Sequence, residues 1–105
     1  MALKFLSKTV SGASAPTALS ATRIACGAIY IETQQDNSDI VWVGDSTVDE
    51  ILGNGKRLEV PAGDDFTLPS WSIAGGLAPN GNNLADIYIV SASANQKVNV
   101  FYEEV

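Results

Sequence analysis

Short stretches of Ile, Val, Tyr and Trp recur along this 105-residue chain, and segments rich in Gly, Asn, Asp, Ser or Pro separate them. The clearest of them are residues 24–33, 40–43, 84–90 and 97–103. β-Branched and aromatic residues suit the half-buried surface of a sheet, and the residues that follow favour turns. The pattern therefore predicts an all-β fold, an antiparallel β-sandwich or jelly roll of about seven or eight short strands.

Alternation along the strands predicts which side chains face the core. Ile29 and Ile31 share one face of the first clear strand and Tyr30 the other, because successive side chains of a strand point to opposite faces. Residues 40–43 are apolar on both faces, so we expect a central strand with Trp42 in the core.

Turn residues predict how the strands are connected. The Asn54-Gly55 pair precedes a strand over residues 56–60, and Phe66 and Leu68 continue in a further short strand. Trp71 and Ile73 would supply one more, before a Gly-rich loop over residues 75–83. The spacing of residues 84–90 and 97–103 suits an antiparallel hairpin that closes the domain.

The first 20 residues differ from the rest, because Gly12 and Pro16 interrupt a small, polar segment and no helical apolar stripe emerges. We predict an N-terminal arm and connector over residues 1–20, extended as a strand edge or reaching a neighbouring molecule, and a β-sandwich domain over residues 21–105. The arm supplies the candidate capsid-binding or inter-subunit residues, which are Leu3, Lys4, Phe5, Leu6 and Lys8.

Composition narrows the partners. The formal net charge of -6, with scattered basic residues, disfavours nucleic acid because it repels the phosphate backbone. No apolar run approaches the roughly 20 residues that span a bilayer, so no membrane partner is predicted. Charged residues make up only 17% of the chain against about 25% in typical domains, which predicts apolar surface that a partner would cover. The lone Cys26 is expected to be a small buried hydrophobe.

The usual residue patterns of catalytic sites are missing or incomplete in this sequence, so we predict that the protein is not an enzyme. The chain has no histidine, the commonest base at neutral pH. Gly44-Asp45-Ser46 lacks the second glycine of a nucleophile elbow and suits a turn. A pair of carboxylates could hydrolyse a glycoside, and the candidates, whose separation the sequence does not give, are Asp45, Asp49, Glu50, Asp64 and Asp65.

Metal and cofactor binding are not predicted either. One cysteine without histidine is unsuited to structural zinc. Residues 36–39 carry four side-chain oxygen groups that could bind calcium, but they lack the spacing and glycine of an EF-hand, and a solvated turn fits better. The scattered glycines form no phosphate-binding loop, so no cofactor is expected.

Trp71 gives the alternative function. Flat aromatic side chains pack against sugar rings, and Trp71 lies between Pro69-Ser70 and Ser72, ahead of the Gly-rich loop. This arrangement is compatible with a phage tail or fibre-associated module that binds host surface glycans. Alternatively, Trp71 has a structural role and packs beneath the Gly-rich loop.

Several strings of the chain, within residues 24–103, together resemble small virion structural proteins of tailed bacteriophages, which include capsid decoration (cement) and head-fibre-like proteins. The strings are Ile40-Val41-Trp42-Val43-Gly44-Asp45-Ser46, Asn54-Gly55, Leu58-Glu59-Val60-Pro61-Ala62-Gly63-Asp64, Ile87-Tyr88-Ile89-Val90 and Val98-Asn99-Val100-Phe101-Tyr102. The resemblance implies a compact β-sandwich that serves as a repeated structural part.

We therefore expect a capsid decoration protein that binds the major capsid protein and stabilises the shell. The resemblance implies a position on the capsid surface of the virion, after assembly in the host cytoplasm. It also implies a homo-oligomer, with a trimer as the preferred state, because cement proteins often occupy local threefold axes. The resemblance transfers no catalytic residue.

Overall fold

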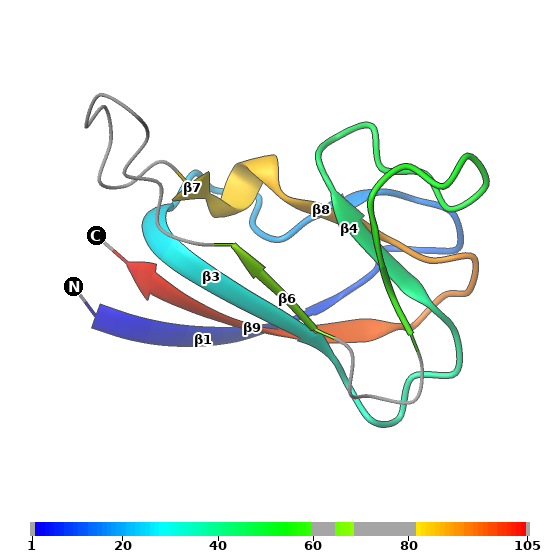
Figure 1. The fold of residues 1–105 in the computed structure, drawn as a ribbon, viewed down its shortest axis with the longest axis horizontal. Helices are drawn as coiled ribbons and strands as arrows, with labels where there is room; N and C mark the ends of the chain where they lie inside the picture. The colour runs from blue at the N-terminus through cyan, green and yellow to red at the C-terminus, as the bar shows by residue number, and fades with distance from the viewer. Residues whose placement is uncertain (1, 60–64, 69–81, 105) are drawn as a thin grey trace.

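A computed structural model describes residues 2–59, 65–68 and 82–104 and shows an all-β chain, as the sequence predicts (Figure 1). These residues form nine strands, two of them only two residues long, and one short 3-10 helix. The elements are β1 (Ala2–Thr9), β2 (Thr17–Ala18), β3 (Ala25–Thr33), β4 (Val41–Gly44), β5 (Lys56–Leu58), β6 (Asp65–Leu68), β7 (Asn82–Asn83), η1 (Leu84–Asp86), β8 (Tyr88–Val90) and β9 (Lys97–Glu104).

The strands form two antiparallel sheets that face each other. The first sheet has the order β1-β9-β3-β6, with β7 also paired to β3, and the second has the order β2-β8-β4-β5. The pairs β1 with β9, β2 with β8, β3 with β6 and β4 with β5 are nested along the chain, and successive pairs alternate between the sheets. The paired strands therefore fold back on one another and form the two layers of the sandwich.

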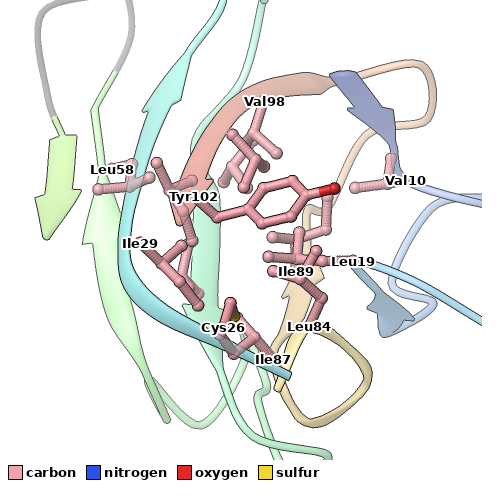
Figure 2. Packing of buried hydrophobic residues seen from close by; sticks show 14 residues of the cluster. Val10, Leu19, Cys26, Ile29, Leu58, Leu84, Ile87, Ile89, Val98 and Tyr102 are labelled. Atoms are coloured by element: carbon pink, nitrogen blue, oxygen red, sulfur yellow. The ribbon is translucent and has the colours of Figure 1, made fainter. Parts of the chain in front are cut away.

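The core lies between the sheets and follows the alternation read from the sequence. In β3, Ile29 and Ile31 are buried and Tyr30 is not, and in β9 the buried set is Val98, Val100 and Tyr102. Side chains from the second sheet, such as Ile89, complete the cluster (Figure 2). Burial of one such aliphatic side chain contributes about 1.5–3 kcal/mol, so the two sheets stabilise each other.

Strand β4 confirms one prediction about the second sheet and corrects another. The prediction of a central strand at residues 40–43 is confirmed, since β4 lies between β8 and β5. The prediction that Trp42 belongs to the core is wrong: β4 buries Val41 and Val43, so Trp42 is half-buried on the outer face. The alternation of side chains along β4 determines where Trp42 lies, because only one face of the sheet is covered by the other sheet.

The prediction for residues 84–90 is also partly wrong. Leu84–Asp86 form the 3-10 helix η1, because the Asn83 side chain accepts a hydrogen bond from the backbone N–H of Ala85 and caps the turn. The predicted hairpin between residues 84–90 and 97–103 does not form: β8 pairs with β2 and β4, whereas β9 pairs with β1 and β3. The connecting loop therefore crosses from one sheet to the other.

In the structure, residues of the predicted arm form two strands of the sandwich, β1 and β2. β1 pairs with β9 over eight residues, from Ala2 opposite Glu104 to Thr9 opposite Lys97, and β2 pairs with β8. β1 is the edge strand of the first sheet in the described part of the chain. Exchange of this strand between copies stays a prediction.

A network of polar side chains joins the β3–β4 loop to the β8–β9 loop. The buried Gln96 accepts hydrogen bonds from the backbone N–H groups of Ser38 (2.8 Å) and Asp39 (2.9 Å) and donates to the Ser38 hydroxyl and the Ala94 carbonyl. The Asn37 side chain exchanges two hydrogen bonds with the Lys97 backbone. The loop over residues 36–39, considered above as an ion site, thus uses its polar groups to fix one end of the sandwich.

Within the described ranges, no helix has the length and apolarity that crossing a membrane would require.

Candidate functional site

An aromatic row crosses the outer face of the first sheet. Phe5 of β1 lies opposite Phe101 of β9, which lies opposite Tyr30 of β3. The Phe5 and Phe101 ring centroids are 4.8 Å apart, and those of Tyr30 and Phe101 are 6.3 Å apart, both tilted by about 50°. Such cross-strand pairs are mutually favourable, and they fix the rings in place. The row is an ordered apolar ridge with Phe5 still 55% exposed.

A small hollow adjoins this row near the chain termini. Leu3, Ala28, Tyr30, Phe101 and Glu103 are among its lining residues, and its volume is about 140 Å³. The pairing of β3 with β9 shifts register between Cys26 and Ile29, and the small Ala28 of this irregular stretch is one of the residues that line the hollow. The Glu103 side chain accepts a hydrogen bond from the Ala28 backbone N–H (3.2 Å), so the carboxylate that borders the hollow is fixed.

Polar side chains occupy the other half of the same face. The Gln34 amide donates hydrogen bonds to Ser7 (2.8 Å) and Asn99 (2.9 Å), and Asn99 donates to Glu32 (3.3 Å). The Tyr30 hydroxyl also donates to Glu32, which joins the aromatic row to this network. The outer face is therefore divided into an apolar half and a polar half.

The structure separates the five residues predicted as the site. Leu3 and Phe5 lie on the outer face, beside the hollow and in the aromatic row. Leu6 packs against the core, on the opposite side of β1. Lys4 and Lys8 alternate with the outward pair, and the Lys4 ammonium lies 3.8 Å from the Glu104 carboxylate. Inward-pointing charges of this kind also discourage an edge strand from pairing with other chains.

Sequence reasoning missed Tyr30, Ala28 and Phe101 as parts of the site. Alternation already placed Tyr30 opposite to Ile29 and Ile31, so a signal for its exposure existed, and Phe101 alternates with buried neighbours in the same way. The strand order that brings them beside β1 was not readable from local patterns. Trp71, the alternative glycan-binding residue, lies outside the described residues.

A second apolar feature is the tip of the β4–β5 loop, formed by Ile51 and Leu52. Their exposed fractions are 82% and 73%. The Asp49 carboxylate accepts hydrogen bonds from both backbone N–H groups (2.8 and 3.2 Å), and Asp49 and Asn54 exchange two backbone hydrogen bonds. The loop is also anchored at Glu50, whose carboxylate accepts a hydrogen bond from the Ser14 hydroxyl. Two apolar side chains are thus presented on a well-ordered turn.

The carboxylates considered for catalysis have structural partners where the structure describes their side chains. Asp45 accepts hydrogen bonds from the hydroxyl (2.5 Å) and backbone N–H (2.8 Å) of Thr47, which lower the pKa of the Asp45 carboxyl. It borders a hollow of about 390 Å³ beside the loop. Asp49 and Glu50 hold the loop tip as described. Asp64 and the side chain of Asp65 lie outside the described part.

An exposed ion pair joins Arg23, which lies just before β3, to Asp86 of η1. The Arg23 guanidinium donates two hydrogen bonds of 3.0 Å to the Asp86 carboxylate, which lower the pKa of Asp86 and raise that of Arg23. Both side chains are more than 60% exposed, so solvent weakens the pair.

Two core residues carry perturbed ionisable groups. Cys26 is fully buried, as predicted, and burial raises the pKa of its thiol. Burial, followed by the charge of Glu104, raises the pKa of the Tyr102 hydroxyl. In the described ranges, no three His, Cys, Asp or Glu side chains are grouped as a metal ion would require.

Comparisons with protein-family models, with curated proteins and with solved structures found no match to this chain. The surface of the molecule and the sequence resemblance are therefore the grounds for a proposed function.

Proposed function

We propose that this protein is a noncatalytic virion structural protein, a capsid decoration protein that binds the major capsid protein of a tailed bacteriophage. The observation that carries the proposal is the apolar half of the outer face, where Leu3, Phe5 and Phe101 are 73%, 55% and 37% exposed. Contiguous exposed apolar surface with a polar border is typical of protein contact sites. The resemblance to phage virion proteins supplies the class of partner.

The strand order supports the same proposal. Nested pairs that alternate between two sheets are the connectivity of a jelly roll, and we infer that the sandwich is of this type. Jelly rolls occur in viral capsid domains and also in lectins, so this inference is a fold-level analogy. The distinction between the two depends on the surface, and the described surface favours aliphatic and aromatic contact with a protein.

The proposed mechanism is adhesion by many copies. Each apolar side chain that leaves water at a contact contributes about 1.5–3 kcal/mol, so one small patch binds weakly. A homo-oligomer, preferably a trimer, would present several patches, and linked sites raise the effective concentration of one another and slow detachment. Bridging of neighbouring capsid proteins in this way would help the shell to resist the pressure of packaged DNA.

Replacement of Phe5 tests this function. We expect Phe5→Ser to weaken binding to purified capsid shells of the encoding phage by about tenfold or more, because an aromatic anchor at an interface is worth about 1.4 kcal/mol or more. The measurement is the number of copies bound per shell as the free protein is titrated. Thr9→Ala is the matched control, because Thr9 is exposed at the far end of the same strand. Equal binding of wild type and Phe5→Ser would contradict the proposed surface.

Point variants are preferable to deletion of the N-terminal segment. Removal of residues 1–18 would delete β1 and β2, which pair with β9 and β8. A deletion would therefore unfold part of both sheets, and a loss of binding would not report on the surface.

A further inference from the structure

Strand β1 has one edge with which no other strand of the described chain pairs. It pairs with β9 on one side only, along the whole of Ala2–Thr9, and Figure 1 shows it, in dark blue, at the border of the first sheet. The free edge of a long strand presents a row of backbone N–H and C=O groups. A strand of another molecule can pair with such a row.

The residues that face the free edge follow from the hydrogen bonds between β1 and β9. The Val10 N–H donates to the carbonyl of Gln96 (3.0 Å), the residue directly opposite when the β1–β9 register is continued by one step. Along an antiparallel pair, residues that bond to the partner strand alternate with residues that do not. The even-numbered residues of β1 therefore bond to β9. The odd-numbered residues turn their backbone groups to the free edge, and they are Leu3, Phe5, Ser7 and Thr9.

A second copy of β1 can pair with this edge about a two-fold axis perpendicular to the sheet. The two strands then run antiparallel, and the outer faces of both first sheets lie on the same side. Odd-numbered residues must lie opposite odd-numbered residues, because only these have free backbone groups. This condition places the axis at a residue of β1, so the register is set by which residue lies on the axis.

The two lysines of β1 exclude two of these registers. An axis at Lys4 places Lys4 of both copies opposite each other, and an axis at Leu6 places Lys4 opposite Lys8. Like charges directly opposite in a sheet are destabilising. The same lysines that discourage edge pairing in general thus act unequally on the possible registers.

An axis at Phe5 gives the longest register in which no two lysines lie opposite each other. It pairs residues 2–8 of one copy with the same residues of the second copy. An axis at Leu3 or at Ser7 pairs fewer residues of the strand, because each lies closer to one of its ends.

The side chains favour the same register. Phe5 then lies opposite Phe5 of the second copy, so the aromatic row of one outer face continues into that of the other. Cross-strand aromatic pairs of this kind are favourable. Lys8 lies opposite Ala2 of the second copy, whose own partner on β9 is Glu104, so an ammonium and a carboxylate have only one strand between them.

We propose that two copies of this protein associate through the free edges of β1, antiparallel and with the two-fold axis at Phe5. The first sheet then continues from one molecule into the next, and the apolar halves of the two outer faces lie side by side without covering each other. This inference goes beyond the proposed function, because it holds for the protein alone. It also names a dimer, whereas the resemblance favours a trimer.

Ser7→Pro and Ser7→Ala test the backbone contact. Proline removes the Ser7 N–H, which faces the free edge, and proline is tolerated on edge strands when its missing N–H faces solvent. Alanine keeps that N–H, and both variants lose the Ser7 hydroxyl that accepts a hydrogen bond from Gln34. We expect Ser7→Ala to dimerise like wild type and Ser7→Pro to dimerise at least about tenfold more weakly.

Phe5→Lys and Phe5→Glu test the register. Each variant alone places like charges opposite each other at the axis, so its dimer should be at least about tenfold weaker. In an equimolar mixture an ammonium faces a carboxylate, so the mixture should associate more tightly than either variant alone. This rescue requires that residue 5 lies opposite itself. Phe5 is 55% exposed, so the fold is expected to persist.

Sedimentation velocity over about 1 to 100 μM protein, in about 0.15 M salt, measures the association. Far-ultraviolet circular dichroism checks the fold of each variant. Should proline unfold the strand, the Phe5 variants decide the outcome.

Four results would overturn the proposal. They are a wild type that stays monomeric throughout, a wild type whose smallest oligomer is a trimer, a folded Ser7→Pro that dimerises as tightly as Ser7→Ala, and a mixture of the Phe5 variants that associates no more tightly than either alone. Because only the purified chain is used, these failures are distinguishable from failure of the capsid proposal, in which single copies could still bind the shell.

Discussion

Gln96→Ala is expected to lower the free energy of unfolding by about 3 kcal/mol, because the buried Gln96 side chain makes four hydrogen bonds and each contributes about 0.5–1.5 kcal/mol. The Gln96 side chain is also the donor to the Ser38 hydroxyl and the Ala94 carbonyl. Its loss would release the two loops that it joins.

Urea unfolding measures this effect as a lower midpoint with an unchanged slope. Gln35→Ala is the matched control, because Gln35 is an exposed glutamine of the β3–β4 loop, and a surface change of this kind stays within about 0.5 kcal/mol. A Gln96 variant as stable as the Gln35 variant would show that the loop network adds nothing to the sandwich.

Gly55→Ala is expected to lower the free energy of unfolding by a similar amount, about 3 kcal/mol, from backbone strain and overpacking together. Gly55 has a φ of +124°, and a Cβ there would lie 2.7 Å from the Val43 carbonyl oxygen and 2.8 Å from a Val48 methyl group. The first of these atoms belongs to the backbone of β4, which its pairing with β5 and β8 holds in place, and the second belongs to a buried side chain.

Gly53→Ala separates the two causes. Gly53 also has a positive φ, +76°, but a Cβ added there would meet nothing within 4 Å. Its substitution should cost only the left-handed backbone penalty, about 1 kcal/mol. Thermal or urea unfolding of both variants provides the comparison, and equal losses would mean that close packing beneath the loop is not what requires glycine at position 55.

Local pattern predicted much of the sandwich. β3, β4 and β9 fall where β-branched residues alternate or cluster, and β5 follows the Asn54-Gly55 turn pair, as the sequence predicts. Alternation also placed Ile29, Ile31 and Tyr30 on their correct faces, because the period of a strand is fixed by its geometry. These features depend only on neighbouring residues, which is why one sequence suffices to predict them.

The predictions are wrong where contacts between residues far apart in the sequence determine the local structure. Residues 84–90 contain the apolar residues of a strand, but capping by Asn83 turns the first three into η1. The hairpin with β9 was wrong because loop length alone does not tell a hairpin from a connection between sheets. Trp42 lies on the outer face because the alternation of β4 turns Val41 and Val43 toward the core instead.

The candidate site was predicted in part for the same reason. Leu3 and Phe5 were expected at a contact surface, and the structure adds Phe101 and Tyr30 through the strand order β1-β9-β3. That order joins the first strand of the chain to the last, and no local pattern carries this information. The loop tip at Ile51 and Leu52, in contrast, is an apolar pair between turn residues, which is a local signal in the sequence.

A density map of intact virions tests the central claim most directly, namely that this chain is an adhesive structural part of a particle. The account predicts many copies on the capsid surface, with the face that carries Leu3, Phe5 and Phe101 buried against the shell or against a neighbouring copy. Purified virions that lack the chain, or copies whose Leu3–Phe5–Phe101 face is open to solvent, would contradict it.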